Sequence, residues 1–329
     1  MKFFNSKSTL GITRALPYAL DFLVRLDSLN VRIVDAAKEA FFPTRCLTCG
    51  SFYRVGKSFR NTLKSILKVL DCRDPSASII EFFFKGDCLS DDMPENGSNA
   101  ETGIFSILMA PFLCLECSGT FLAIESPICS TCGMVFRSRL GEDHICGACF
   151  NDPKSYQKAR SAGIYDNVMM DAIHCLKYYG KIQLAKPLSL FLFFIFCRYW
   201  HGKFPDLIIP VPLHNKKLRR RGFNPSFFLV KEWASIIGAS DNGFPVMPIA
   251  EDILLRTRRT KSQTGLGRKE RLKNIKNAFA VNDPSRIHRK KILLIDDVYT
   301  TGATANECSK VLMAAGASHV DVLTLARAV

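Results

Sequence analysis

Residues 291–304, with the sequence KILLIDDVYTTGAT, constrain the fold more than any other part of this chain. The apolar run at 292–295 is typical of a strand buried on both faces of a parallel sheet. A small, hydroxyl-rich loop follows at 300–304, then apolar residues at helical spacing from 308 to 315, then a second apolar run at 320–325. This order predicts a strand–loop–helix–strand unit whose loop lies at the carboxyl edge of the sheet, where open α/β folds bind ligands.

The loop has the composition of an anion site. Backbone amides at a helix start bind phosphate, and Gly302 lets a ligand approach the backbone closely. Threonine hydroxyls at 300, 301 and 304 add further donors. These residue types indicate a phosphate group as the ligand of the loop.

Two adjacent carboxylates, Asp296 and Asp297, precede the loop and cannot serve the phosphate itself. They suit the vicinal hydroxyls of a sugar or the waters of a Mg²⁺ ion. A purely structural alternative exists, because Thr304 and Glu307 have the spacing of a capping box. Capping alone does not require the two carboxylates, so we expect a phosphorylated sugar to bind here.

Eight of the 13 cysteines form four Cys-x-x-Cys pairs, a pattern typical of structural zinc. Two pairs complete one tetrahedral site, so two sites are expected, whereas a redox function would need only one pair. The simplest pairing joins the first two pairs and the last two, and the spacing also allows an interleaved one. The predicted ligands are Cys46, Cys49, Cys114, Cys117, Cys129, Cys132, Cys146 and Cys149.

Composition narrows the class of protein. The chain has 329 residues, of which 47% are hydrophobic, and a net charge of +15, with basic residues concentrated in the C-terminal half. This charge favours phosphate-bearing ligands and is compatible with nucleic acid, although a basic surface can also serve solubility alone. The most apolar stretch, 188–197, is too short to span a bilayer. With no recognisable signal peptide and a metal-type cysteine pattern, we expect a cytoplasmic protein without a membrane span.

Three regions are expected along the chain. Residues 1–43 form an N-terminal amphipathic helical extension, residues 44–150 a double zinc ribbon interrupted by an insertion at about 50–113, and residues 151–329 an α/β domain. Within the insertion, 87–101 lacks Lys and Arg and has the composition of a loop.

The α/β domain is expected to contain a regular series of elements. Strands are predicted at 159–165, at the edge of the sheet, and at 207–211 and 278–281; helices are predicted at 168–178, 182–200 and 226–237. Cationic loops are predicted at 213–225 and 260–268.

The segment ILLIDDVYTTGAT resembles the phosphoribosyl-pyrophosphate (PRPP) signature of type I phosphoribosyltransferases. The wider layout is similar to the ComF family of competence-associated, phosphoribosyltransferase-like proteins. The matching parts are the Cys-x-x-Cys pairs, HCLKYYG at 174–180, VPLH at 211–214, RRRGFN at 219–224 and the basic segment from 258 to 263. The resemblance covers about two-thirds of the chain and implies a parallel sheet flanked by helices.

The resemblance also implies roles for residues. Asp296 and Asp297 would hold the ribose hydroxyls directly or through Mg²⁺, while Lys177 and Arg259 complete the catalytic group, Arg259 on a lid. The remaining ligand-binding positions are Thr300, Thr301, Gly302, Ala303 and Thr304 around the 5′-phosphate, and Arg219 and Arg221 facing the pyrophosphate.

Three functions remain open at this level. The chain could be an enzyme that transfers phosphoribose from PRPP to an unknown acceptor, or a module that senses PRPP without turnover. It could also be a competence factor that binds single-stranded DNA and works with a helicase partner. Aromatic platforms among the basic residues, which single-strand binders use, are not evident, because Phe223, Phe227 and Phe228 are expected in the core.

Overall fold

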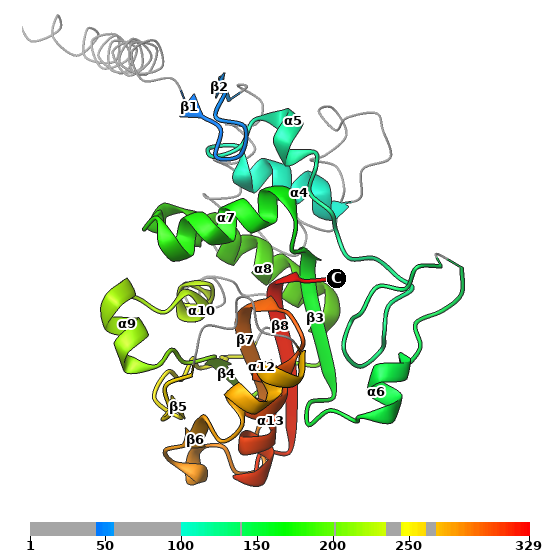
Figure 1. The fold of residues 1–329 in the computed structure, drawn as a ribbon, viewed down its shortest axis with the longest axis vertical. Helices are drawn as coiled ribbons and strands as arrows, with labels where there is room; N and C mark the ends of the chain where they lie inside the picture. The colour runs from blue at the N-terminus through cyan, green and yellow to red at the C-terminus, as the bar shows by residue number, and fades with distance from the viewer. Residues whose placement is uncertain (1–43, 56–99, 139, 201, 235–244, 261–267) are drawn as a thin grey trace, which may run out of the picture.

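The structure is a computed structural model that describes residues 44–55, 100–138, 140–200, 202–234, 245–260 and 268–329 (Figure 1). The predicted helical extension at 1–43 and most of the predicted insertion lie outside these residues, as does the centre of the predicted lid, 261–267.

A four-stranded parallel sheet forms the centre of the α/β domain, in the order β3-β8-β7-β4. The strands are β3 (Lys158–Ile164), β4 (Leu207–Pro210), β7 (Lys291–Tyr299) and β8 (His319–Arg327). β3 lies at an edge, as predicted. The strand predicted at 292–295 is longer than expected, because its pairing with β8 continues through Asp296 to Tyr299.

Alternate residues of the central strands enter two different cores, as the two-residue period of a strand requires. Leu293 and Ile295 of β7 pack on the side of α8 (Ala185–Trp200). Ile292 and Leu294 pack on the opposite side, against α13 (Ala303–Ala314). Both faces of β7 are therefore buried, which explains its continuous apolar run.

Helix α8 is apolar around almost its whole circumference because it is a core helix. It follows η1 (Ile182–Leu184), and the combined segment 182–200 is long and apolar enough to cross a membrane by length and composition alone. Two-thirds of that window is buried inside the fold, as in the core helix of a soluble protein. The apolar stretch 188–197 alone is shorter than a membrane span, whereas the helical segment that contains it is long enough. Burial within the fold explains its apolar composition.

Helices α7 and α10 begin at side-chain caps. The carboxylate of Asp166 accepts a bond from the first amide of α7 (Asn167–Tyr178). The side chain of Asn224 does the same for α10 (Pro225–Phe228), accepting from the amide of Ser226 at 3.2 Å. α10 ends at Phe228, whereas the sequence predicted a helix over 226–237; residues 235–237 lie outside the described part.

The basic segments join a smaller sheet beside the central one. β5 (Leu254–Arg256) pairs antiparallel with β6 (Phe279–Val281), which is the predicted strand at 278–281. The nearby helical segments are α9 (Asn215–Arg221), α12 (Arg268–Ile275) and η2 (Pro284–Arg286).

The described part of the cysteine-rich region contains short elements. Its elements are β1 (Thr44–Arg45), β2 (Phe52–Tyr53), α4 (Ala100–Met109), α5 (Leu115–Ser118) and α6 (Gly147–Asn151). Within α4, Phe105 and Leu108 are fully buried in the core on the α8 side, and Glu101 forms an ion pair with Arg198 of α8. The end of the predicted insertion, including a residue predicted to lie in a loop, is thus part of the core.

Candidate phosphoribosyl site and cysteine centres

The carboxylates of β7 lie at the carboxyl edge of the sheet and have different neighbours. Successive strand side chains point to opposite faces, so Asp297 lies on the α7 side and Asp296 towards α10 and α13. Asp297 forms an ion pair of 2.6 Å with Lys177, from the last turn of α7. The structure therefore brings together three of the four predicted catalytic side chains.

Lys177 is charged in this setting. Burial opposes the charge of its ammonium group, but the attraction and hydrogen bond of Asp297, with a contribution from Asp296, outweigh burial and raise the pKa of Lys177. The ammonium group is a fixed cation beside the two carboxylates.

Asp296 is harder to ionise. Burial, followed by repulsion from Asp297, raises the pKa of Asp296 to about 7, against the opposing effect of Lys177. Its Oδ1 accepts hydrogen bonds from the Ser226 hydroxyl at 3.1 Å and from the Asp297 amide at 2.9 Å. Near neutral pH this carboxyl can accept or supply a proton.

The loop after β7, at 300–304, is the predicted anion cradle, and a left-handed glycine leads from it into α13. Gly302 is the N-cap of α13 and has φ 75°, a left-handed conformation that favours glycine. A Cβ at this position would lie 2.1 Å from the hydroxyl of Tyr299, so no side chain fits between the loop and that ring. The capping-box alternative is wrong, because Gly302 caps the helix and the Glu307 carboxylate instead accepts from the Asn277 amide at 2.6 Å.

Helix α9 carries the predicted pyrophosphate-facing arginines. It begins at His214, whose Nδ1 accepts from the Lys216 amide at 3.2 Å. Arg219 is exposed. The Arg221 guanidinium lies 5.3 Å from the centre of the ring of Tyr178, the residue that follows Lys177 in the sequence. Lys217 on the same helix is exposed, and the pKa of its ammonium group is lowered by desolvation and then by the nearby charges of Arg221 and Lys177.

Arg259 is exposed at the end of a described segment, and the structure does not show it closing over the site. Arg256 lies deeper: burial lowers its pKa, against the opposing effects of Cys308 and Asp296. It also bonds Thr260 and lies 5.4 Å from the Phe279 ring centre. Arg256 and Ser226 were not predicted as site residues, because their position depends on tertiary contacts that no local motif reports.

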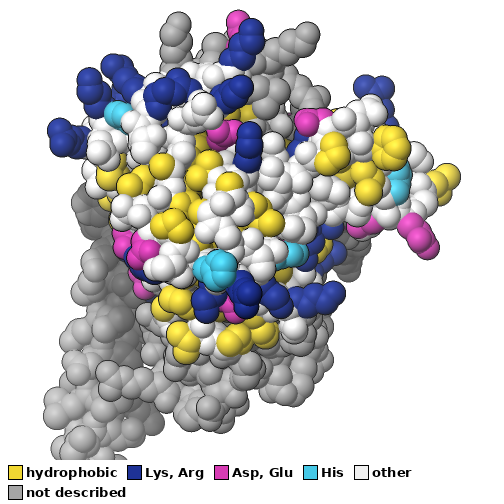
Figure 2. Space-filling view, turned by 90° about the horizontal axis from the view of Figure 1, so that it is seen from below, with side chains coloured by type: hydrophobic (Ala, Val, Ile, Leu, Met, Phe, Trp, Pro, Cys, Tyr) yellow, Lys and Arg dark blue, Asp and Glu magenta, His cyan; other side chains and the backbone are white. Residues whose placement is uncertain are grey.

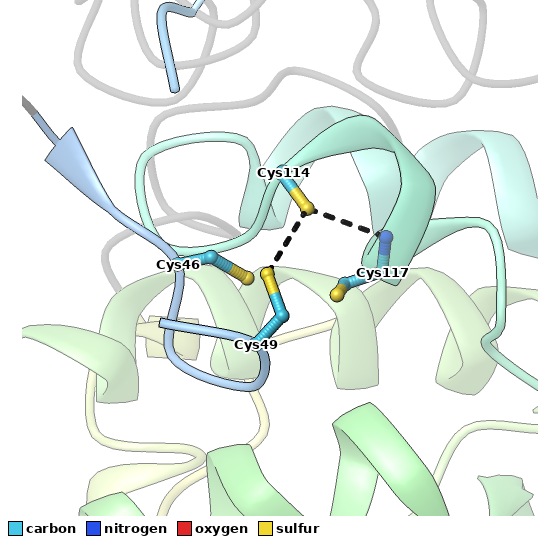
Figure 3. A group of neighbouring side chains, drawn as sticks. All are labelled: Cys46, Cys49, Cys114 and Cys117. Carbon is cyan, nitrogen blue, oxygen red and sulfur yellow. Dashed lines mark hydrogen bonds between the residues drawn. The ribbon is translucent and has the colours of Figure 1, made fainter. Parts of the chain in front are cut away.

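The eight cysteines form two groups that match the simplest predicted pairing. Each group has its four sulfur atoms within 4.8 Å of one another. Figure 3 shows the four side chains of the first group pointing towards one another. The two groups are Cys46, Cys49, Cys114 and Cys117, and Cys129, Cys132, Cys146 and Cys149.

Both groups could hold zinc. A tetrahedral ion with Zn–S bonds of about 2.3 Å separates its sulfur ligands by about 3.8 Å. The Cys49 and Cys114 sulfurs are 3.9 Å apart, and those of Cys132 and Cys146 are 3.8 Å apart. Although burial opposes its ionisation, amide donors from Cys132 and Cys146 help lower the pKa of Cys129 to about 6, which favours the thiolate that a metal needs.

Glycine shapes two of the cysteine turns. Gly50 and Gly133, which follow Cys49 and Cys132, have φ 74° and 70°. Gly147, which follows Cys146, instead begins α6 with no positive φ.

The chain is similar to proteins named for competence and the use of DNA. It is 30% identical over 234 residues to "Competence protein F" of Haemophilus influenzae, a match that covers 66% of this chain and 97% of the relative. It is 30% identical to "DNA utilization protein YhgH" of Escherichia coli (67% and 99%) and to "Competence protein ComFC" of Streptococcus pneumoniae (65% and 87%). No protein-family model matches the chain.

Proposed function

This chain belongs to the ComF family, and on that premise we propose that it binds PRPP with Mg²⁺ and transfers the phosphoribosyl group to an acceptor, within a process that uses DNA. The observation that carries the proposal is the juxtaposition of Asp296, Asp297 and Lys177 with the glycine-capped start of α13. One half of this arrangement suits sugar hydroxyls, and the other suits a phosphate.

The residues divide the work by charge. The carboxylates would accept hydrogen bonds from the ribose hydroxyls, and the loop amides and threonines would bind the 5′-phosphate. As the bond to pyrophosphate breaks, positive charge develops on the sugar and negative charge on the leaving group. Asp296 and Asp297 would stabilise the first, and Arg221 and Lys217 on α9 would stabilise the second. Bound Mg²⁺ would supply further compensation for the pyrophosphate charge.

The Lys177–Asp297 ion pair would change partners on binding. In the free protein, Lys177 neutralises the charge of Asp297, the carboxylate that would bind the ribose hydroxyls or the cation of the ligand. Ribose hydroxyls and a cation approaching Asp297 would release the ammonium group towards the leaving pyrophosphate, which would make Lys177 a switchable cation of the site.

Calorimetry tests the proposal. PRPP is titrated into the zinc-loaded protein with and without Mg²⁺, and into Asp296→Asn/Asp297→Asn, which keeps the size of both side chains. We expect Mg²⁺-dependent binding that the double variant loses. Asp252→Asn is the matched control, because this exposed carboxylate pairs with Arg286 away from the site. Failure of folded, zinc-loaded wild type to bind would reject the proposed substrate.

A second candidate is a non-catalytic competence factor that binds single-stranded DNA with a helicase partner. One observation favours the DNA part: Tyr178 and Tyr179, at the end of α7, are 57% and 75% exposed. Arg221 of α9 lies over the Tyr178 ring, and such an aromatic and cationic pair is a combination that single-strand binders use. Seen from below, the described surface carries its Lys and Arg side chains in separate groups and not in one continuous basic patch (Figure 2).

Fluorescence anisotropy with an oligonucleotide at several salt concentrations tests this candidate. Tyr178→Ala/Tyr179→Ala should weaken binding by about 1–3 kcal/mol per stacked base. Phe150→Ala is the control, because that ring is 76% exposed on α6. An equal loss of DNA affinity in both variants, or no DNA binding at moderate salt, would contradict this candidate. The basic residues would then serve only to bind substrate phosphates. We place either activity in the cytoplasm, where thiols remain reduced.

A further inference from the structure

Two buried arginines on strands of the central sheet donate hydrogen bonds to the Cys129–Cys132 turn. Arg160 of β3 donates through Nη1 to the Ser130 carbonyl at 3.1 Å. Arg327, at the end of β8, donates through Nη1 to the Cys132 carbonyl at 2.6 Å, and its Nη2 lies 3.7 Å from the Cys132 sulfur. They are 7% and 6% exposed, so each is a buried cation whose environment includes the cysteine centre.

Arg327 differs from Arg160 in what lies on its other side. Its guanidinium is 4.4 Å from the centre of the Tyr299 ring, the last residue of β7 before the loop. Arg160 instead lies 5.4 Å from the ring of Tyr199, on α8. Of these two arginines, only Arg327 joins the cysteine turn to the residue that precedes the anion cradle.

Tyr299 in turn contacts the 300–304 loop. Its hydroxyl lies against Gly302, where a Cβ would be 2.1 Å away, and is 2.6 Å from the hydroxyl of Tyr156. The chain reaches Tyr156 directly after the second cysteine group, and the preceding amide, of Ser155, donates to Asn306 Oδ1 in the first turns of α13 at 2.8 Å. The second cysteine group therefore contacts the loop region by two routes.

We propose that metal at the second cysteine group positions the 300–304 loop through Arg327 and Tyr299, so that metal binding and anion binding are coupled. A zinc ion with four thiolates carries net negative charge, which holds the buried guanidinium against Cys132. The guanidinium then fixes the Tyr299 ring, and the ring fixes the backbone at Gly302. Arg327 and Tyr299 are positioning residues, and PRPP as the anion rests on the proposed function.

The test compares Arg327→Lys with Arg160→Lys, both zinc-loaded and checked for wild-type metal content. Lysine keeps the charge but cannot bridge a carbonyl, a sulfur and a ring with one planar group. The first measurement is hydrogen exchange of peptides covering residues 299–306, which needs no ligand. The second is the dissociation constant for PRPP with Mg²⁺.

We expect Arg327→Lys to accelerate exchange of the loop peptides and to weaken PRPP binding by about fivefold or more, the lower range of measured couplings between sites. Arg160→Lys should leave both at wild-type values. Wild-type exchange in the loop of Arg327→Lys, or equal acceleration in both variants, would overturn the coupling. If wild type binds no PRPP, the proposed function fails, and the exchange comparison alone decides whether the loop is positioned by the cysteine centre.

Discussion

At the scale of single residues, the two adjacent carboxylates of β7 have different protonation properties because the strand turns them to opposite faces. Asp297 forms an ion pair with a lysine, whereas the half-buried Asp296 accepts hydrogen bonds from the hydroxyl of Ser226 and from an amide. The site thus contains one carboxylate paired with a cation and one whose pKa is about 7. Each arrangement leads to a separate prediction.

Lys177→Met should destabilise the protein by about 3 kcal/mol, because it leaves two neighbouring carboxylates without their cation. The side chains of Lys177 and Asp297 are only 15% and 14% exposed, so water compensates little. Urea unfolding measures the effect. Adding Asp297→Asn to the variant should recover much of the loss; if the double variant is no more stable than the single one, the ion pair is not the source of the cost.

Asp296→Asn should become more stabilising as the pH rises. The carboxyl has a pKa of about 7 in the folded chain against a reference value of 3.8, so the folded state binds more protons in that interval. Wild-type stability from this group is therefore greatest at low pH and falls as pH rises through about 7, and the asparagine variant has no such loss. The melting temperature of the variant relative to wild type should increase between about pH 5 and pH 8.

Asp252→Asn provides the matched comparison for this pH series. Its carboxyl forms a hydrogen bond with Arg286 that lowers its pKa, the opposite direction from Asp296. It should show no gain in stability with rising pH. A flat difference between Asp296→Asn and wild type would mean that Asp296 ionises normally.

At the scale of elements, edge strand β3 is covered by residues 121–131, which link the two cysteine groups and enter the second. The Ile164 amide donates to the Leu122 carbonyl at 2.8 Å, and the Ala159 amide to the Thr131 carbonyl at 2.7 Å. Between them Gly163 admits the Phe121 ring, because a Cβ there would be 2.4 Å from that ring. The covering protects an exposed sheet edge from pairing with another chain.

Gly163→Ala should therefore destabilise the protein by about 1–3 kcal/mol, the usual cost of overpacking, and loosen the linker from the strand. Thermal unfolding and exchange at residues 121–124 would measure both effects. Gly147→Ala is the control, since a Cβ at this position meets nothing within 4 Å. Similar losses in the two variants would show that the close contact with Phe121 is not responsible.

The elements that the sequence predicted best are those whose signals are local. The apolar runs of β7 and β8 and the periodicity of α13 depend on neighbours in the chain, and so do the four cysteine turns. The end of β7, the shortness of α10 and the core position of α4 depend on pairing and packing with distant segments. For the same reason Asp296 and Asp297 were predicted as site residues, whereas Ser226 and Arg256 were not.

At the scale of the whole molecule, the central sheet separates two cores, and each cysteine group belongs to a different one. Cys46 packs with α4 and α8 on one side. Cys129, Cys132, Cys146 and Cys149 pack with Tyr299 and α13 on the other. The two groups resemble one another in sequence, yet only the second adjoins the loop of the candidate site.

Metal analysis should find two zinc ions per chain, one for each group, and Cys49→Ser and Cys129→Ser should each reduce the number to one. The consequences should differ, because Cys49 is exposed at the α4 side whereas Cys129 is buried beside the sheet. Loss of the second ion should accelerate hydrogen exchange at 299–306, and loss of the first should accelerate it in α4 while the loop keeps its protection. A single zinc in wild type would show that the first group, whose two halves are separated in the sequence by residues 50–113, does not hold an ion.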